Sequence, residues 1–139
     1  MKKILVGVDG SSESRTAAEQ AANLAADSGA AVLLAYVVRP PVTLPPETVS
    51  LERWDFAERE YARELLEDVA GAYRERGISV DTVMPSGGPA ETLAKMALEQ
   101  DVDLVVVGHR GRGAISRVLL GSVADRLVQI SPKPVLVSR

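Results

Sequence analysis

Two glycine-containing segments in the last third of the chain have a spacing suited to binding a phosphate. The first is Gly108-His109-Arg110-Gly111, and after nine further residues the second is Gly121-Ser122-Val123. Glycine lets main-chain N–H groups approach an oxyanion closely because no Cβ lies in the way. The pattern G-x2-G-x9-G-[ST] therefore predicts two clusters of backbone donors that converge on one polyphosphate.

The second glycine segment is also expected to begin a helix. An apolar run over 103–107 would carry the chain to the carboxyl edge of a parallel sheet. A helix from Ser122 would then present its free N–H groups and positive dipole end to the same anion. The pattern lacks the Gly-Lys-Ser/Thr ending of a Walker A loop, and 111–116 lacks the last glycine of a dinucleotide fingerprint. Both of those motifs are therefore excluded.

Charged side chains near these glycines could take part in binding. Arg110, Arg112 and Arg117 could offset phosphate charge, and Arg112 is the preferred candidate. Asp9 follows an apolar run, where it would either face a ligand or cap the next helix, an interaction that contributes ~1 kcal/mol. His109 is the only histidine. Without cysteine or a nearby carboxylate pattern it makes a poor metal site, and Mg²⁺ would instead be carried on the phosphates.

The elements that would position these residues alternate between apolar strands and amphipathic helices. Strands are expected at 4–8, 32–38, 78–84, 103–107 and 134–137. Helices are expected from a serine cap at 11 or 12 to Gly29, over 51–76, from Gly88-Pro89 onward, and over 122–130. Strands that alternate with helices require right-handed crossovers. The order therefore predicts a doubly wound α/β fold with a five-stranded parallel sheet covered on both faces.

In such a fold, ligands bind at the carboxyl ends of the strands, where the strand order reverses. Asp9 and Gly108 follow the first and fourth strands, so they are expected to form pocket walls if these strands are neighbours. The segment 39–50 contains four prolines and few apolar anchors, and it is expected to be an exposed, mobile loop that could respond to ligand.

The longest helix, 51–76, is expected to bury a stripe of large side chains. Residues advance along it by three or four positions, while acids and arginines fill the other face. The stripe consists of Trp54, Ala57, Tyr61, Leu65, Val69 and Tyr73. Its aromatic residues are therefore interpreted as core residues rather than as platforms for stacking a base.

Composition indicates one soluble domain over 1–139. Hydrophobic residues make up 46% of the chain, and its longest apolar runs are far shorter than the roughly 20 residues of a membrane span. The formal charge of -3 argues against nucleic acid bound on a broad basic face. Cysteine is absent, and the first residues lead into a strand pattern rather than a signal peptide, so a cytoplasmic location is expected.

Taken together, these motifs resemble the universal stress protein family, in its single-domain, ATP-binding type. The similarity includes 2–11 (KKILVGVDGS), 87–90 (GGPA), 134–137 (PVLV) and the complete glycine pattern. It implies a Rossmann-like sheet of order 3-2-1-4-5, with adenine near the end of the first strand and the backbone of Val37. It implies ribose and phosphates at 108–113 and 121–123. The residues expected to contact ATP, ADP or AMP are Gly7, Asp9, Val37, Gly108, His109, Arg110, Gly111, Arg112, Gly113, Gly121, Ser122 and Val123.

Three functions remain open from the sequence. The first is an adenine-nucleotide-binding regulatory protein, a homodimer paired through Val135 to Val137, since an apolar edge strand tends to acquire a partner and the resemblance implies the same. The second is a slow ATPase or phosphotransferase, for which the sequence offers arginines but no evident general base. The third is a nucleotide-free dimeric interaction module. The retained glycines favour the first.

Overall fold

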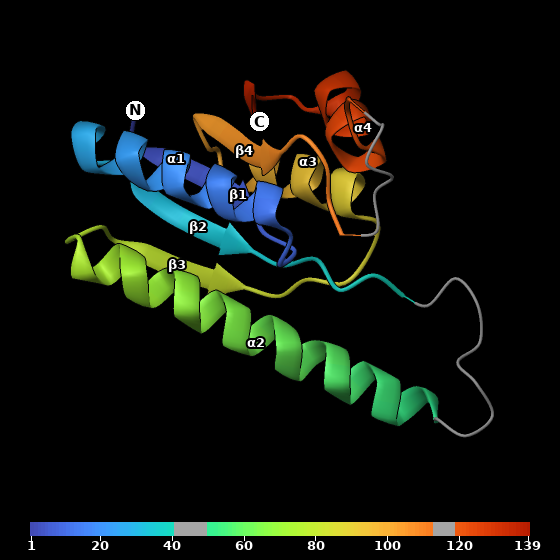
Figure 1. Ribbon diagram of the computed structural model, residues 1–139. Coiled ribbons are helices and arrows are strands. Elements are labelled where there is room, and N and C mark those ends of the chain that lie inside the picture. The colour runs from blue at the N-terminus through green and yellow to red at the C-terminus, as the bar shows by residue number, and fades with distance from the viewer. Residues whose placement is uncertain (41–49, 113–118) are drawn as a thin grey trace.

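A computed structural model describes residues 1–40, 50–112 and 119–139 of the chain. Within these ranges five strands alternate with four helices (Figure 1). The strands are β1 (Lys3–Gly7), β2 (Ala31–Ala35), β3 (Val80–Val83), β4 (Leu104–Gly108) and β5 (Val135–Ser138). The helices are α1 (Ser12–Ser28), α2 (Leu51–Glu75), α3 (Pro89–Glu99) and α4 (Ser122–Ile130).

The strands form one parallel sheet in the order β3-β2-β1-β4-β5. In its centre Leu5 of β1 lies between Leu33 of β2 and Val105 of β4. This order confirms the predicted fold, including the adjacency of the first and fourth strands. Because all strands are parallel, the segments that follow β1, β2 and β4 meet at one edge of the sheet.

Two helices cover each face of the sheet. Ile4 and Val6 face α1 and α2, whereas Leu5 between them faces α3 and α4. Side chains on both faces of β1 are therefore buried, which explains why the strand is a continuous apolar run rather than an alternating one. In Figure 1 α2 runs along the β3 side of the sheet and α4 lies at the opposite side.

Helix α1 lies close to the sheet because the residues that it buries are small. They are Ser14, Ala17, Ala18, Ala21, Ala22 and Ala25. Ser11 is the N-cap, accepting a hydrogen bond from the Ser14 N–H, and Gly29 ends the helix with φ of 75°. Both predicted helix ends are thus confirmed. On its other side α1 is joined to α2, because the buried Tyr73 hydroxyl donates to the Ala18 carbonyl.

The predicted second strand is too long. Regular pairing ends at Ala35, and Val38 forms only an isolated bridge with Ser86. The Val38 N–H donates to the carbonyl of Pro85, which has no N–H to continue the ladder. The third strand is shorter than predicted as well. Of the predicted loop 39–50, residues 41–49 lie outside the described residues.

The predicted buried stripe of α2 is partly wrong. The helix buries Ala62, Leu66, Ala70 and Tyr73, so its buried face lies about one residue on from the prediction. Ala57 is exposed, and Tyr61 retains 41% of its accessible surface. The reason is that the first half of α2 extends past the sheet, where Trp54 borders a cavity instead of the core. No helix in the described ranges combines the length and apolar character needed to cross a membrane.

Candidate functional site

A cavity of about 790 Å³ opens at the carboxyl edge of β1, β2 and β4. The first half of α2 and the beginning of α4 complete its walls. Ten of the twelve residues predicted to contact a ligand line this cavity, namely Gly7, Asp9, Val37, Gly108, Arg110, Gly111, Arg112, Gly121, Ser122 and Val123. The sequence motifs and the family resemblance together therefore singled out residues that the fold brings together from four separate segments.

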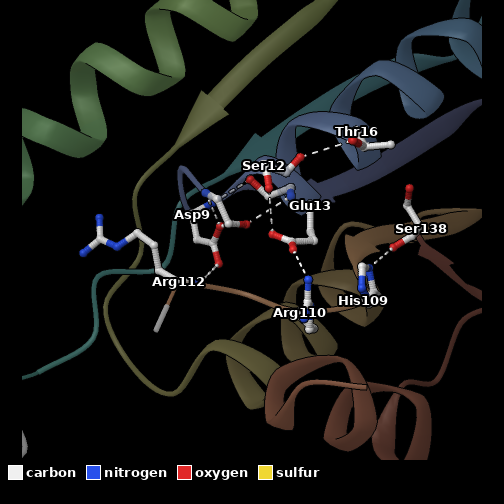
Figure 2. Close-up of polar contacts among 10 residues, drawn as sticks. Asp9, Ser12, Glu13, Thr16, His109, Arg110, Arg112 and Ser138 are labelled. Carbon is white, nitrogen blue, oxygen red and sulfur yellow. Dashed lines mark hydrogen bonds and ion pairs between the residues drawn. The ribbon is translucent and has the colours of Figure 1, made fainter. Parts of the chain in front are cut away.

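The other two predicted residues have different positions. His109 is directed toward the last strand, where its backbone N–H and its Nδ1 lie 2.7 and 3.1 Å from the Ser138 carbonyl oxygen (Figure 2). Since a carbonyl only accepts, Nδ1 carries the proton in this contact. His109 thus fastens the glycine segment to β5 and does not line the cavity. Gly113 lies outside the described residues.

Asp9 joins the beginning of α1 to the glycine segment after β4. Its Oδ1 accepts hydrogen bonds from the Ser11 N–H at 2.9 Å and the Ser11 hydroxyl at 2.6 Å. Its Oδ2 accepts one from the Arg112 N–H at 3.0 Å (Figure 2). Since Ser11 is the side-chain cap of α1, the structure does not give Asp9 the capping role. The carboxylate instead holds the beginning of α1 and the backbone of Arg112 together, and this part of the cavity lining is called the cavity floor.

Close packing inside the protein also favours glycine at the motif positions, most strongly at Gly108, where the neighbouring atoms belong to the backbone. A Cβ on Gly108 would lie 2.8 Å from the backbone carbon of Glu13, and one on Gly111 would lie 2.5 Å from Asp9 Oδ2. A Cβ on Gly121 would lie 3.1 Å from the Arg110 Cα. The Gly121 N–H donates to the His109 carbonyl at 2.6 Å, which joins the two glycine segments directly.

Helix α4 directs its amino end at the cavity. Its N-cap residue, Gly121, makes no side-chain capping hydrogen bond, and the Asp125 N–H closes the first helical turn onto the Gly121 carbonyl. The preceding residues, Ser122, Val123 and Ala124, all line the cavity. The first N–H groups of a helix have no partner within the helix, and together with the dipole they attract an anion. This end of the cavity is therefore suited to a phosphate.

Both described arginines of the glycine segment contact carboxylates on helices. Arg110 Nη2 lies 2.7 Å from Glu13 Oε1 of α1, in a pair that is largely shielded from solvent. Hydrogen bonding to its own backbone, and then to Arg110, holds the pKa of Glu13 below its ordinary value. Arg112 extends toward α2, where its Nη2 lies 3.6 Å from Glu58 Oε1.

Sequence reasoning missed an aromatic and acidic group beside Arg112. The Tyr36 hydroxyl donates to Glu58 Oε1 at 2.5 Å and accepts from Arg112 Nη1 at 3.2 Å. Burial, reinforced by Glu58, raises the pKa of Tyr36, so the hydroxyl keeps its proton at neutral pH. The Arg112 guanidinium lies over the Tyr61 ring, 4.8 Å from its centre. These residues form the Arg112 cluster: Arg112, Tyr36, Glu58 and Tyr61.

The sequence contains a weak signal for this cluster. Trp54 and Glu58 are four residues apart and therefore share one helix face, and both line the cavity together with Tyr36. Only the position of α2 relative to β2 shows that this face meets the cavity. Among residues 1–40, 50–112 and 119–139, no group of three or more acidic or histidine side chains is placed to hold a metal ion.

Comparison with known proteins identifies the family and agrees with the fold. The model of the universal stress protein family matches residues 1–139. Universal stress protein MJ0531 of Methanocaldococcus jannaschii is 38% identical over 98% of this chain and 81% of its own length.

Solved structures give the same result. UspA from Lactobacillus plantarum superposes with a TM-score of 0.90 at 27% identity, over 99% of this chain and 97% of its own. A universal stress protein in complex with cAMP has a TM-score of 0.75 at 26% identity, over 99% of this chain and 97% of its own. With its sheet order, its glycine pattern and a family match from end to end, the chain belongs to the universal stress protein family.

Proposed function

We propose that this protein binds an adenine nucleotide, ATP or its shorter forms ADP and AMP, and acts as a regulatory protein in a stress response. The observation that carries the proposal is the composition of the cavity. Its walls combine the ends of β1 and β2 with the amino end of α4 and the glycine segment after β4. One end of the same cavity is thus suited to a base, and the other to phosphates.

The size and the lining of the cavity support this arrangement. Its volume of about 790 Å³ falls within the ordinary range for small-molecule sites. Gly7 and Val37 would contact the adenine, and Asp9 would face the adenosine moiety. The segments 108–111 and 121–123 would hold the phosphates, which would carry Mg²⁺. The solved relative in complex with cAMP supports an adenine nucleotide as the ligand class.

The hydrogen bonds made by the acidic side chains of the cavity support nucleotide binding rather than nucleotide hydrolysis. Of the described residues that line the cavity, Asp9 and Glu58 carry carboxylates. Asp9 accepts three hydrogen bonds from the protein, and Glu58 accepts one from Tyr36 that does not depend on Arg112. A carboxylate occupied in this way is poorly placed to take a proton from an attacking water. The nucleotide would therefore act as a signal, in a cytoplasmic homodimer paired through β5.

The first test identifies the ligand. Freshly purified protein is denatured and the released small molecules are identified by mass spectrometry. Stripped protein is then titrated with ATP, ADP and AMP in a calorimeter, with and without Mg²⁺. A bound adenine nucleotide that rebinds stoichiometrically supports the proposal. The proposal fails if none of the three nucleotides produces heat and none is released.

The variant Ser122→Asp tests the phosphate end of the cavity. Ser122 is the exposed first residue of α4, so a carboxylate there repels a phosphate while it favours the helix by about 0.3–1 kcal/mol. We expect ATP affinity to fall at least about tenfold without loss of thermal stability. The matched control is Ser12→Asp, at the exposed first position of α1, which does not line the cavity. Equal effects of the two substitutions on ATP affinity would place the phosphates elsewhere.

A further inference from the structure

The Arg112 side chain is held at the wall of the cavity by residues of β2's end and α2. Its Nη1 donates to the Tyr36 hydroxyl at 3.2 Å, and its Nη2 pairs with Glu58 Oε1 at 3.6 Å. Its guanidinium lies 4.8 Å from the centre of the Tyr61 ring. Tyr36, Glu58 and Tyr61 thus orient the Arg112 guanidinium in this structure.

The backbone of Arg112 is fixed independently of its side chain. The Arg112 N–H donates to Asp9 Oδ2, so the main chain stays on the cavity floor whichever way the side chain points. The side chain keeps 47% of its accessible surface, whereas the Glu58 side chain keeps 20%. Figure 2 shows the Arg112 guanidinium directed away from Arg110 and Glu13. Arg112 can therefore rotate without breaking its attachment to Asp9.

A nucleotide phosphate in the same cavity would compete with Glu58 for this guanidinium. A bidentate contact, in which a guanidinium donates two hydrogen bonds to one phosphate, is stronger than the 3.6 Å contact between Arg112 and Glu58. The competition lowers the apparent affinity for the nucleotide. The intrinsic affinity is multiplied by the fraction of molecules in which Arg112 is already released from Glu58. Neither Tyr36 nor Glu58 belongs to the glycine motif, yet both would set that fraction.

We propose that Glu58 and Tyr36 are positioning residues that hold the Arg112 side chain against α2 while the cavity is empty. A bound nucleotide then releases Arg112 from Glu58, and its guanidinium turns toward the phosphates. This inference rests on the proposed nucleotide site. The contact between Arg112 of the glycine segment and Glu58 of α2 would then determine the specificity for phosphate charge. Ligand occupancy is then communicated to α2 through the loss of that contact.

The experiment is a double-mutant cycle on the full chain, with ATP as the probe. Glu58→Gln removes the charge but leaves an oxygen that still accepts from Tyr36. Because a partly exposed ion pair is worth little, we expect ATP affinity to rise by about two- to fivefold. Arg112→Ala should lower ATP affinity, and Glu58→Gln should have no further effect in the Arg112→Ala background. Tyr36→Phe provides a second way to weaken the hold, with the same expected direction.

The matched control is Glu60→Gln, which makes the same charge change on α2 at a residue that pairs with Arg63 and does not line the cavity. It should leave ATP affinity unchanged. A rise of equal size from Glu58→Gln with and without Arg112 would mean simple electrostatic repulsion and would overturn the inference. Unchanged or weaker binding by Glu58→Gln, with folding verified by circular dichroism, would overturn it too.

A second readout follows α2 directly. Trp54 is the only tryptophan in the chain and lies one helical turn before Glu58. We expect inorganic tripolyphosphate, which has phosphates but no base, to change Trp54 emission in the wild type and not in Arg112→Ala. If wild type binds ATP but the cycle shows no coupling, only the release of Arg112 from Glu58 fails. If wild type binds no nucleotide, the proposed function fails and this inference with it.

Discussion

At the scale of single residues, Asp9 connects the ends of two strands that are distant in sequence. Its two oxygens accept three hydrogen bonds, two from Ser11 and one from Arg112. The sequence predicted that Asp9 would lie at the pocket, because it follows a buried strand. It did not predict the partners, since the Arg112 N–H comes close only after β1 and β4 pair.

Asp9→Asn is expected to weaken both the cavity floor and nucleotide binding. The amide can replace only one carboxylate oxygen, so one of the donors that face Asp9 loses its acceptor. The free energy of unfolding should fall by roughly 1–3 kcal/mol, as measured by urea denaturation, and ATP affinity should fall with it.

Asp103→Asn is the matched control for that change. Asp103 Oδ2 accepts from the Lys2 and Lys3 N–H groups, and these hydrogen bonds hold the pKa of Asp103 below its ordinary value. This variant should lose stability but retain wild-type affinity for ATP. Equal losses of affinity in both variants would show that Asp9 acts through global stability alone.

At the scale of elements, the sequence predicted the existence and type of every strand and helix in the described ranges. Caps and buried runs supplied that information: Ser11 and Gly29 bound α1, and α4 begins at Ser122 as the glycine pattern required. The face of α2 was harder, because its first half packs beside a cavity. A helix face that borders a cavity has the same sequence pattern as one that packs in the core. The sequence therefore wrongly predicted that Tyr61 is buried.

Gly108→Ala tests the contact between β4 and α1. The new Cβ would lie 2.8 Å from the Glu13 carbonyl carbon, and backbone atoms cannot move aside as a flexible side chain can. We expect the free energy of unfolding to fall by about 1–3 kcal/mol and ATP affinity to fall because α1 shifts.

The same substitution in α2 should have the opposite sign. A Cβ on Gly71 meets nothing within 4 Å, and alanine is favoured over glycine inside a helix by roughly 0.5–1 kcal/mol. Gly71→Ala should therefore raise the free energy of unfolding and leave ATP affinity unchanged. Stabilisation by both substitutions would contradict the close packing at Gly108.

At the scale of the whole molecule, β5 is the last strand in the described sheet order, and it pairs with β4 on one side. Val135, Leu136 and Val137 are each only partly buried. An apolar edge of this kind favours pairing with another strand. Ser138 of the same strand contacts His109, whose neighbours Gly108 and Arg110 line the cavity, so a dimer through β5 would lie close to the cavity.

If the chain forms the proposed dimer through β5, Val137→Lys is expected to leave a folded monomer. A lysine on an edge strand opposes edge-to-edge pairing, and its long stem lets the charge reach solvent from a partly buried position. Sedimentation velocity over a range of protein concentrations measures the mass, and circular dichroism verifies the fold. A wild-type chain that is monomeric at every concentration would contradict pairing through β5.

The parallel sheet gives the molecule two unlike ends. The cavity occupies the carboxyl end, whereas the turns that lead into β2, β3 and β4 lie at the amino end and include Gly29, Gly77 and Asp101. A Cβ on Gly29 or Gly77 would meet nothing within 4 Å, although both glycines have a positive φ. A fluorescent label or inserted peptide next to these turns would therefore stand a full strand length away from the cavity. Such an attachment would leave every wall of the cavity unaltered, so the amino end is where the protein could be immobilised or fused to another domain.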